Sequence, residues 1–337
     1  MSKLRSSRNL FGALLALGLL VAAIGGCRST KSPTSASWAK ARILSDKEDH
    51  PSKIIADGVN VYYVTGGTVA SQQEGTNNIK KISLPDGNVS ILVKGGQTIP
   101  DTTLAQDDKY IYWSDGGSLM RVAKTGGASE KIIPQAPKPD EIVMDDENIY
   151  WLIWGGEGSP PEPLMTAPKK GGEAKPLTPK YLGTSGIAED ENFVYWMTGD
   201  GLNEIRKIGG EVIPISHDGS KTPLGLRMDA DNFYFCGMAK NGESALMRLS
   251  KSTGELVQLA PSINHTMEFV IDDANVYYFD NVKGEGSFGP VALMKVAKTG
   301  GSPVEIDRGT AGWIKFLTTD AKQVYFTDIS KVYAIAK

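Results

Sequence analysis

The chain has 337 residues and nearly balanced charges, with 36 lysines and arginines against 39 aspartates and glutamates and a net charge of −3. With no basic block in the sequence, this balance argues against nucleic acid as a partner. The length is ample for one hydrophobic core or, by length alone, for two small domains.

Residues 1–26 have the order of features of a secretory signal. Three basic residues precede an apolar run from Leu10 to Ile24, which is too short for a confident membrane span. The run ends in Ile24-Gly25-Gly26-Cys27, which resembles the lipobox of bacterial lipoproteins. The resemblance implies that residues 1–26 are removed and that Cys27 is lipidated. The alternative is an ordinary secretory peptide with a chance cysteine.

Lipidation of Cys27 would fasten the protein to a membrane without a spanning segment. Each buried CH₂ contributes about 0.8 kcal/mol, so two or three acyl chains anchor stably. Arg28 stands where inner-membrane lipoproteins have Asp, and the resemblance therefore implies the outer membrane, with the domain on its periplasmic or surface side. Residues 27–37 are polar and poor in aromatics, and we expect a flexible tether.

After the tether, one strand pattern of aromatic and β-branched residues returns seven times, as in Ile111-Tyr112-Trp113. Acidic turns precede these strands, and glycine-rich turns follow the next strand, as in 110–133. The marker tyrosines are Tyr62, Tyr112, Tyr150, Tyr195, Tyr234, Tyr277 and Tyr325. A recurrence every 38 to 50 residues, with four strand signals per unit, is typical of propeller blades.

The sequence therefore predicts an all-β fold, a seven-bladed β-propeller of four-stranded antiparallel blades over residues 38–337. The last unit, 315–337, has only three strand signals. Residues 38–44 look like the missing fourth strand, and we expect them to join the last blade and close the ring. Closure would remove an exposed sheet edge that invites aggregation.

Connections between the predicted strands fall into two classes. Within a blade, the first-to-second and third-to-fourth turns are short and alike. The second-to-third loops and the links between blades are long and differ from one another, as in 66–78 and 155–163. In a propeller each class lies on one face, giving a uniform face and an irregular face. Loops of the irregular kind on a rigid scaffold are where binding usually occurs.

The stretch from Ile111 to Gly127 resembles the YWTD repeat of low-density lipoprotein receptor class B domains. It is closer still to bacterial lipoproteins of unassigned function built from such repeats. The resemblance covers roughly residues 50–337 and implies the blade structure. YWTD domains have six blades, whereas seven units are counted here, and only the second unit has the sequence Tyr-Trp-Ser-Asp.

Two repeated motifs have structural explanations. An aspartate recurs before the marker strands, at Asp107, Asp145, Asp190, Asp229, Asp272 and Asp320. Aspartate is favoured in tight turns, where it accepts bonds from backbone amides, and this role is favoured over a metal site. The G-x-G-x-x-G match at 284–289 precedes a predicted strand rather than a helix, which excludes a dinucleotide site.

Glu141 and Glu268 lie at the starts of predicted innermost strands, near the mouth of the central channel. Carboxylates around a channel can hold Ca²⁺ through oxygen ligands. Propeller lactonases use an axial metal of this kind, so a calcium-dependent hydrolase is the alternative function. No nucleophile with an adjacent base can be identified in the sequence, and no cofactor is expected for the first hypothesis.

The irregular face is also expected to carry aromatic and histidine side chains able to bind sugar or peptide. The candidates are Trp154, Tyr181, His217, His265, Phe288 and Trp313. Packing of loops against blade edges is the alternative role for each. The other cysteine, Cys236, falls in the fifth marker strand and is expected to be a buried thiol.

The leading hypothesis from sequence is a lipid-anchored binding or scaffolding propeller of the cell envelope. It would be a monomer that recognises an envelope protein or polysaccharide through its irregular face.

Overall fold

The computed structural model describes residues 38–66, 77–95, 104–115, 117–137, 139–153, 162–179, 183–199, 201–216, 224–239, 241–260, 268–282, 290–309 and 316–337. All of them belong to one compact unit, Ser35–Lys337. The predicted signal segment 1–26 and tether 27–37, Cys27 included, lie outside the described residues. Within the described ranges, no helix is long and apolar enough to span a membrane.

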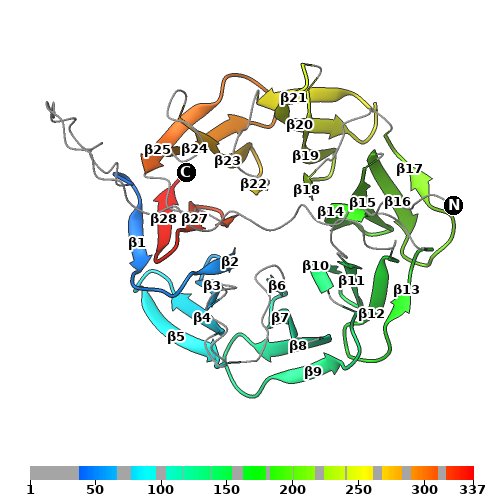
Figure 1. Ribbon diagram of the computed structural model, residues 1–337, viewed down its shortest axis with the longest axis horizontal. Helices are drawn as coiled ribbons and strands as arrows, with labels where there is room; N and C mark the ends of the chain where they lie inside the picture. Colours follow the sequence, from blue (N-terminus) through cyan, green and yellow to red (C-terminus); the bar gives the residue numbers. More distant parts are fainter. Residues whose placement is uncertain are drawn as a thin grey trace, which may run out of the picture. The chain divides into compact units, whose positions relative to one another are not determined.

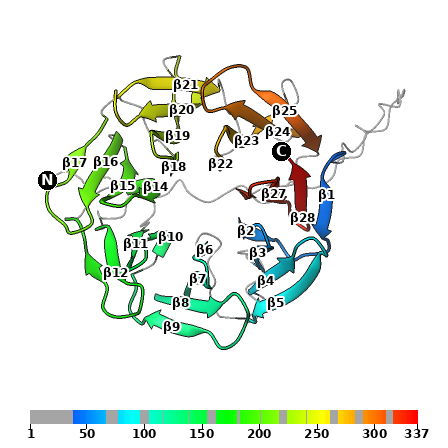
Figure 2. The same cartoon turned by 180° about the vertical axis from the view of Figure 1, so that it is seen from behind.

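Seven four-stranded antiparallel sheets stand around a common centre (Figures 1 and 2). We call their strands A to D from the centre outwards. The first three sheets are β2 (Ser52–Ala56), β3 (Asn60–Thr65), β4 (Asn78–Ser83) and β5 (Asn88–Val93); β6 (Leu104–Gln106), β7 (Tyr110–Asp115), β8 (Ser118–Ala123) and β9 (Glu130–Ile133); and β10 (Pro139–Met144), β11 (Asn148–Ile153), β12 (Met165–Pro168) and β13 (Lys175–Pro176).

The next three sheets follow the same order. They are β14 (Gly183–Glu189), β15 (Phe193–Thr198), β16 (Gly201–Arg206) and β17 (Ile213–Pro214); β18 (Leu224–Met228), β19 (Asn232–Met238), β20 (Ser244–Ser250) and β21 (Leu256–Ala260); and β22 (Phe269–Ile271), β23 (Asn275–Asn281), β24 (Val291–Ala297) and β25 (Val304–Gly309). The seventh is β26 (Leu317–Thr319), β27 (Gln323–Thr327), β28 (Val332–Ala336) and β1 (Arg42–Ser45). The predicted seven-bladed all-β propeller is confirmed.

The seven marker strands are the B strands, and their middle residues are buried on both faces. In β7, for example, Ile111, Tyr112 and Trp113 are at most 2% exposed. Each B strand is covered because its sheet packs between two neighbouring sheets. Trp113, for example, packs against Tyr62 of the first sheet. Full burial of one large apolar side chain contributes about 1.5–3 kcal/mol, so these inter-blade layers hold most of the core.

The ring is closed by the N-terminal strand, as the sequence predicted. β1 pairs antiparallel with β28, with Arg42 opposite Ala334 and Ile43 opposite Tyr333. Trp38, ahead of β1, is 8% exposed, and its ring lies 4.7 Å from that of Phe326 between centroids. The first and last segments of the propeller therefore form one sheet (blue and red in Figure 1).

Trp38 also fastens the closing segment to the sixth blade. Its ring lies 5.9 Å from that of Phe279, edge to face. The backbone amide of Lys40 donates to the Asp307 carboxylate at 2.8 Å, and that of Ala41 donates to the same carboxylate oxygen at 3.2 Å. The closing segment thus contacts both the seventh blade, whose sheet it completes, and the sixth blade.

Blades four and five approach each other closely at a glycine. Gly186, in β14, has φ +100°, and a Cβ there would lie 2.6 Å from the backbone nitrogen of Leu226 in β18. Any side chain at this position would push two inner strands apart, so the residue must be glycine.

Two minor predictions from sequence are also met. Cys236 is buried in β19, and burial raises the pKa of its thiol to about 12, which makes it a poor nucleophile. The segment after the rejected G-x-G-x-x-G match is the strand β24, so no helix N-terminus follows that motif.

Candidate functional site

The central channel contains a cavity of about 400 Å³. The A strands of all seven blades contribute to its wall. Most of the lining side chains are apolar. The charged ones are Lys53, Glu141, Glu189, Arg227 and Glu268.

Two ion pairs join blades that are not neighbours. Arg227 Nη1 of the fifth blade lies 3.4 Å from Glu141 Oε1 of the third. Lys53 Nζ of the first blade lies 4.0 Å from Glu268 Oε1 of the sixth. The side chains are between 19% and 30% exposed, so all four ends are accessible from the cavity.

Glu141 and Glu268, the two carboxylates predicted from sequence as calcium ligands, are thus both in the wall of the channel. Each has a cation beside it. Among the described residues, no three acidic, histidine or cysteine side chains are grouped closely enough to hold a metal ion. The calcium site stays a prediction.

The other sequence-predicted site residues fall in connections outside the described ranges. They are Trp154, Tyr181, His217, His265, Phe288 and Trp313. Each of the six lies between the described strands of a B–C or a D–A connection, the two classes that the sequence assigns to the irregular face. Their role in binding stays a prediction.

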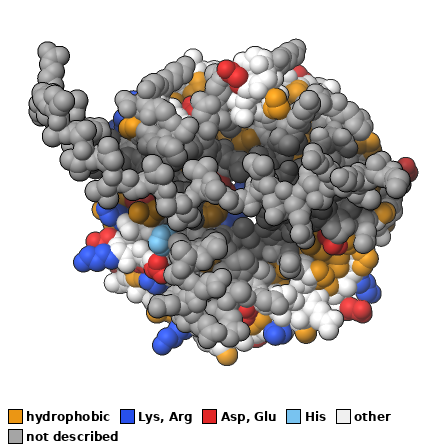
Figure 3. Space-filling model, viewed as in Figure 1, with side chains coloured by type: hydrophobic (Ala, Val, Ile, Leu, Met, Phe, Trp, Pro, Cys, Tyr) orange, Lys and Arg blue, Asp and Glu red, His pale blue; other side chains and the backbone are white. Residues whose placement is uncertain are grey.

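The two faces differ as the sequence predicted. Every A–B turn has three residues, such as 57–59, 107–109 and 320–322. The B–C connections are unlike one another: 66–77 joins β3 to β4, whereas only 116–117 joins β7 to β8. Charged side chains of both signs are scattered around the visible rim, with no single-sign patch (Figure 3).

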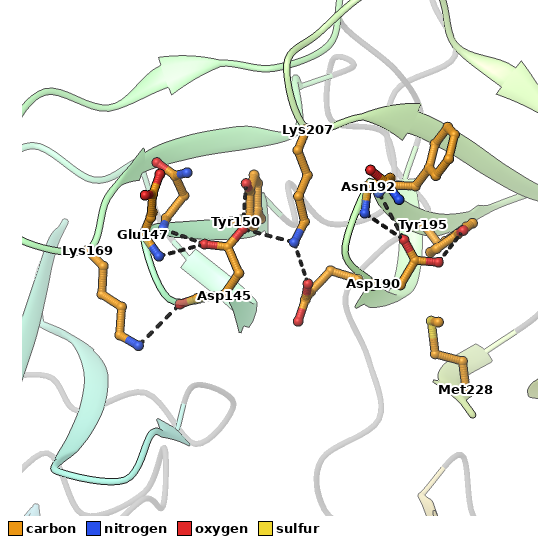
Figure 4. Close-up of polar contacts among 12 residues, drawn as sticks. Asp145, Glu147, Tyr150, Lys169, Asp190, Asn192, Tyr195, Lys207 and Met228 are labelled. Atoms are coloured by element: carbon orange, nitrogen blue, oxygen red, sulfur yellow. Dashed lines mark hydrogen bonds and ion pairs between the residues drawn. The ribbon is translucent and has the colours of Figure 1, made fainter. Parts of the chain in front are cut away.

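On the uniform face, the aspartate that opens each A–B turn organises the turn. In the third blade, Asp145 Oδ1 accepts hydrogen bonds from the backbone amides of Glu147 and Asn148, at 2.8 and 2.7 Å. Its other oxygen accepts one from the Tyr150 hydroxyl at 3.1 Å (Figure 4). The same arrangement occurs in every blade, with Asp–Tyr distances of 2.6 to 3.3 Å. The predicted turn role is confirmed, and Asp57 is a seventh member that the sequence reading missed.

A lysine from the following blade completes six of these clusters. Lys207, for example, lies 2.8 Å from Asp145 Oδ2 (Figure 4). It also lies 2.6 Å from Glu189 Oε2. The six lysine–aspartate pairs, 2.7 to 3.9 Å long, are Lys124–Asp57, Lys169–Asp107, Lys207–Asp145, Lys251–Asp190, Lys298–Asp229 and Lys337–Asp272. We call them the inter-blade lysine links. They were missed at the sequence level, although a lysine follows the C strand in each of these blades.

The pKa shifts of the turn aspartates and their tyrosines agree with these contacts. Burial alone would raise the pKa of Asp107, but hydrogen bonds from Lys169, Tyr112 and two backbone amides outweigh it and lower the pKa to about 2. Burial, then the hydrogen bond and charge of Asp107, raises the pKa of Tyr112 well above its ordinary value. The hydroxyl therefore stays protonated and donates to an ionised carboxylate, which makes a strong hydrogen bond.

One inter-blade lysine link is replaced by an apolar contact, at the junction between the last and first blades. The backbone amide of Leu84 donates to Val59 O at 2.8 Å, as that of Lys124 donates to Lys109 O. Leu84 therefore occupies the lysine position of the first blade. It packs in the cluster that contains Tyr325, the hydrogen-bond partner of Asp320.

Restoring the lysine is expected to stabilise the junction. Leu84→Lys would lay its aliphatic stem along Tyr325 and bring its ammonium to Asp320, as the six observed links do. We expect a gain of about 0.5–1 kcal/mol over Leu84→Met, which has a similar length without the charge. Urea unfolding at low salt measures the difference. The gain should vanish in an Asp320→Asn background, and a gain that persists there would contradict the explanation.

These observations define the class of protein: the chain is a seven-bladed β-propeller whose A–B turns are built alike. No protein-family model matches the sequence, and neither does any curated protein. Among solved structures, the chain is similar to an oligogalacturonate lyase in complex with manganese, with a TM-score of 0.67 and 15% identity over 90% of this chain and 94% of that one.

The chain is also similar to two further solved structures. The extracellular domain of a one-component system from B. thetaiotaomicron has a TM-score of 0.59 and 12% identity, over 89% of this chain and 40% of that one. The computationally designed Ika8 protein has a TM-score of 0.56 and 12% identity, over 88% and 98%. At these identities the similarities show the fold alone.

Proposed function

We propose that the protein is a lipid-anchored binding propeller of the cell envelope. In this proposal, Cys27 carries the lipid at the outer membrane, and the irregular face recognises an envelope protein or polysaccharide. The observation that supports it best is the contrast between the faces. Seven A–B turns of equal length are fixed by aspartate–tyrosine bonds, whereas the B–C connections range from the two residues 116–117 to the long segment 66–77.

A rigid scaffold with variable loops on one face is the general arrangement of binding proteins. On the uniform face, six turn aspartates and six lysines are engaged in links between blades, so they are less available to a partner. The calcium-dependent hydrolase remains the alternative. No particular observation favours it, because Arg227 and Lys53 lie beside the two carboxylates it requires.

The test combines localisation with crosslinking in intact membranes followed by mass spectrometry. Cys27→Ser should move the protein from the membrane fraction to the soluble fraction. Trp154→Ala, Phe288→Ala and Trp313→Ala together should remove the crosslinked envelope partner. Ile208→Ala is the matched control, because Ile208 is 90% exposed in a C–D turn of the uniform face. Identical crosslinks in the triple variant and the control would overturn the proposed face, and membrane retention of Cys27→Ser would overturn the anchor.

A further inference from the structure

The wall of the channel carries charges of both signs, and one of the five charged residues, Glu189, is paired with Lys207 at 2.6 Å. Lys53 belongs to the first blade, Glu268 to the sixth, Arg227 to the fifth and Glu141 to the third. Lys53 pairs with Glu268, and Arg227 pairs with Glu141. The guanidinium carbon of Arg227 also lies 5.8 Å from the ring centroid of Phe269, the residue that follows Glu268. The two pairs are therefore neighbours in one cavity, and together they are neutral.

Both pairs are longer than the lysine–carboxylate contacts on the uniform face, apart from Lys251–Asp190 at 3.9 Å. Their N–O distances are 3.4 and 4.0 Å, against 2.6 Å for Lys207–Glu189 and 2.9 Å for Lys298–Asp229. Partly exposed ion pairs of this kind contribute little to stability, typically below about 1 kcal/mol. Their opening therefore costs little, and each group can exchange its partner for one on a ligand.

The pattern of signs restricts what such a ligand can be. A simple anion bound to Arg227 or Lys53 would leave Glu141 or Glu268 without a cation in a confined space, which is unfavourable. A simple cation would have the converse effect. A ligand with one charge of each sign leaves the net charge of the wall unchanged, because Glu141 and Lys53, the two partners that it displaces, are of opposite sign.

We propose that the channel binds a small zwitterion with the dimensions of a short peptide. Its carboxylate would lie against Arg227, whose planar fork suits two-point binding of a carboxylate. Its ammonium would lie against Glu268. Apolar wall residues such as Val143 and Val270 would contact short side chains. A cavity of about 400 Å³ is within the range of small-molecule sites, about 300–1,000 Å³.

This site is distinct from the proposed function, because it consists of residues in or next to the A strands and needs neither the irregular loops nor the anchor. The probe is trialanine, compared with its N-acetylated form, which lacks the ammonium, and its C-terminal amide, which lacks the carboxylate. Isothermal titration calorimetry on the purified protein should show trialanine binding at millimolar concentration or below. Each capped form should bind about tenfold more weakly or worse, the loss of one charge-assisted contact.

Two variants assign the contacts. Arg227→Gln should abolish the preference for trialanine over its amide and keep the preference over the acetylated form. Glu268→Gln should do the reverse. Arg206→Gln, at an exposed arginine of β16, is the matched control and should change neither preference. Melting curves check that the variants fold, and Arg227→Lys, which keeps the charge, should retain part of the preference if Arg227→Gln does not fold.

Three results would overturn the proposal. One is no detectable binding of trialanine by the wild-type protein at millimolar concentration. Another is equal binding of the free and capped peptides. The third is unchanged selectivity in folded Arg227→Gln or Glu268→Gln protein, which would place the peptide elsewhere.

Discussion

Deletion of residues 38–44 is expected to lower the melting temperature by about 10 °C or more. The deletion removes most of β1 and with it the pairing to β28. It also removes Trp38, which packs on Phe279 and Phe326. Loss of a buried Trp side chain alone costs about 3–5 kcal/mol, and each kcal/mol corresponds to about 2–4 °C in a chain of this size class.

Circular dichroism melting curves provide the measurement. Deletion of residues 28–34, an equally long piece of the polar segment between Cys27 and Trp38, is the control and should leave the transition in place. Trp38→Ala should account for roughly half of the effect of the full deletion, because the strand pairing is retained. A full deletion that melts with the wild-type protein would mean that the ring does not depend on its N-terminal strand.

Asp107→Ala is expected to destabilise the protein by about 2–3 kcal/mol. Asp107 accepts hydrogen bonds from two backbone amides and from the Tyr112 hydroxyl, and it lies 2.9 Å from Lys169 Nζ of the next blade. Hydrogen bonds to charged groups contribute about 1.5–3 kcal/mol, and removal of the acceptor leaves several donors without a partner. Urea unfolding at neutral pH gives the free energy of unfolding.

Asp108→Ala is the matched control, because Asp108 is the exposed next residue of the same turn. We expect it to change the stability by less than about 0.5 kcal/mol. The pKa of Asp107 is lowered from its ordinary value of 3.8 to about 2, so its contribution is complete above about pH 4 and is lost as the pH falls through 2. The difference between wild type and Asp107→Ala should therefore shrink in acid. Equal stabilities for the Asp107 and Asp108 variants would contradict the role of the cluster.

The blade count and the turn aspartates could be predicted from the sequence because the units repeat. The closing strand could be predicted because the last unit has only three strand signals. In each unit an aspartate precedes a strand that contains the marker tyrosine. This pattern depends only on local backbone geometry, which is the same in every copy. Asp57 was missed because its turn has a glycine where most others have a second acid. The last turn of the chain holds an eighth pair, Asp328 with Tyr333, at 2.7 Å.

The contacts between blades could not be predicted in the same way. Lys207 pairs with Asp145 of the neighbouring blade, and no local sequence pattern in either segment predicts this pair. The channel charges are harder still, because Arg227 and Glu141 are 86 residues apart and belong to blades that are not adjacent. Glu141 and Glu268 were identified in advance, from their position at the start of inner strands, but the ion pair that each one makes was not.

The shared sheet of β1 and β28 determines how the protein would respond to mechanical force. Any pull on the amino-terminal segment reaches the fold through Trp38 and β1 before it reaches any other strand. β1 is the outermost strand of its sheet, held along one side by β28 alone. Tension applied to the chain ahead of Trp38 would therefore peel this strand first and open the ring at the junction between the last and first blades, where leucine replaces the lysine.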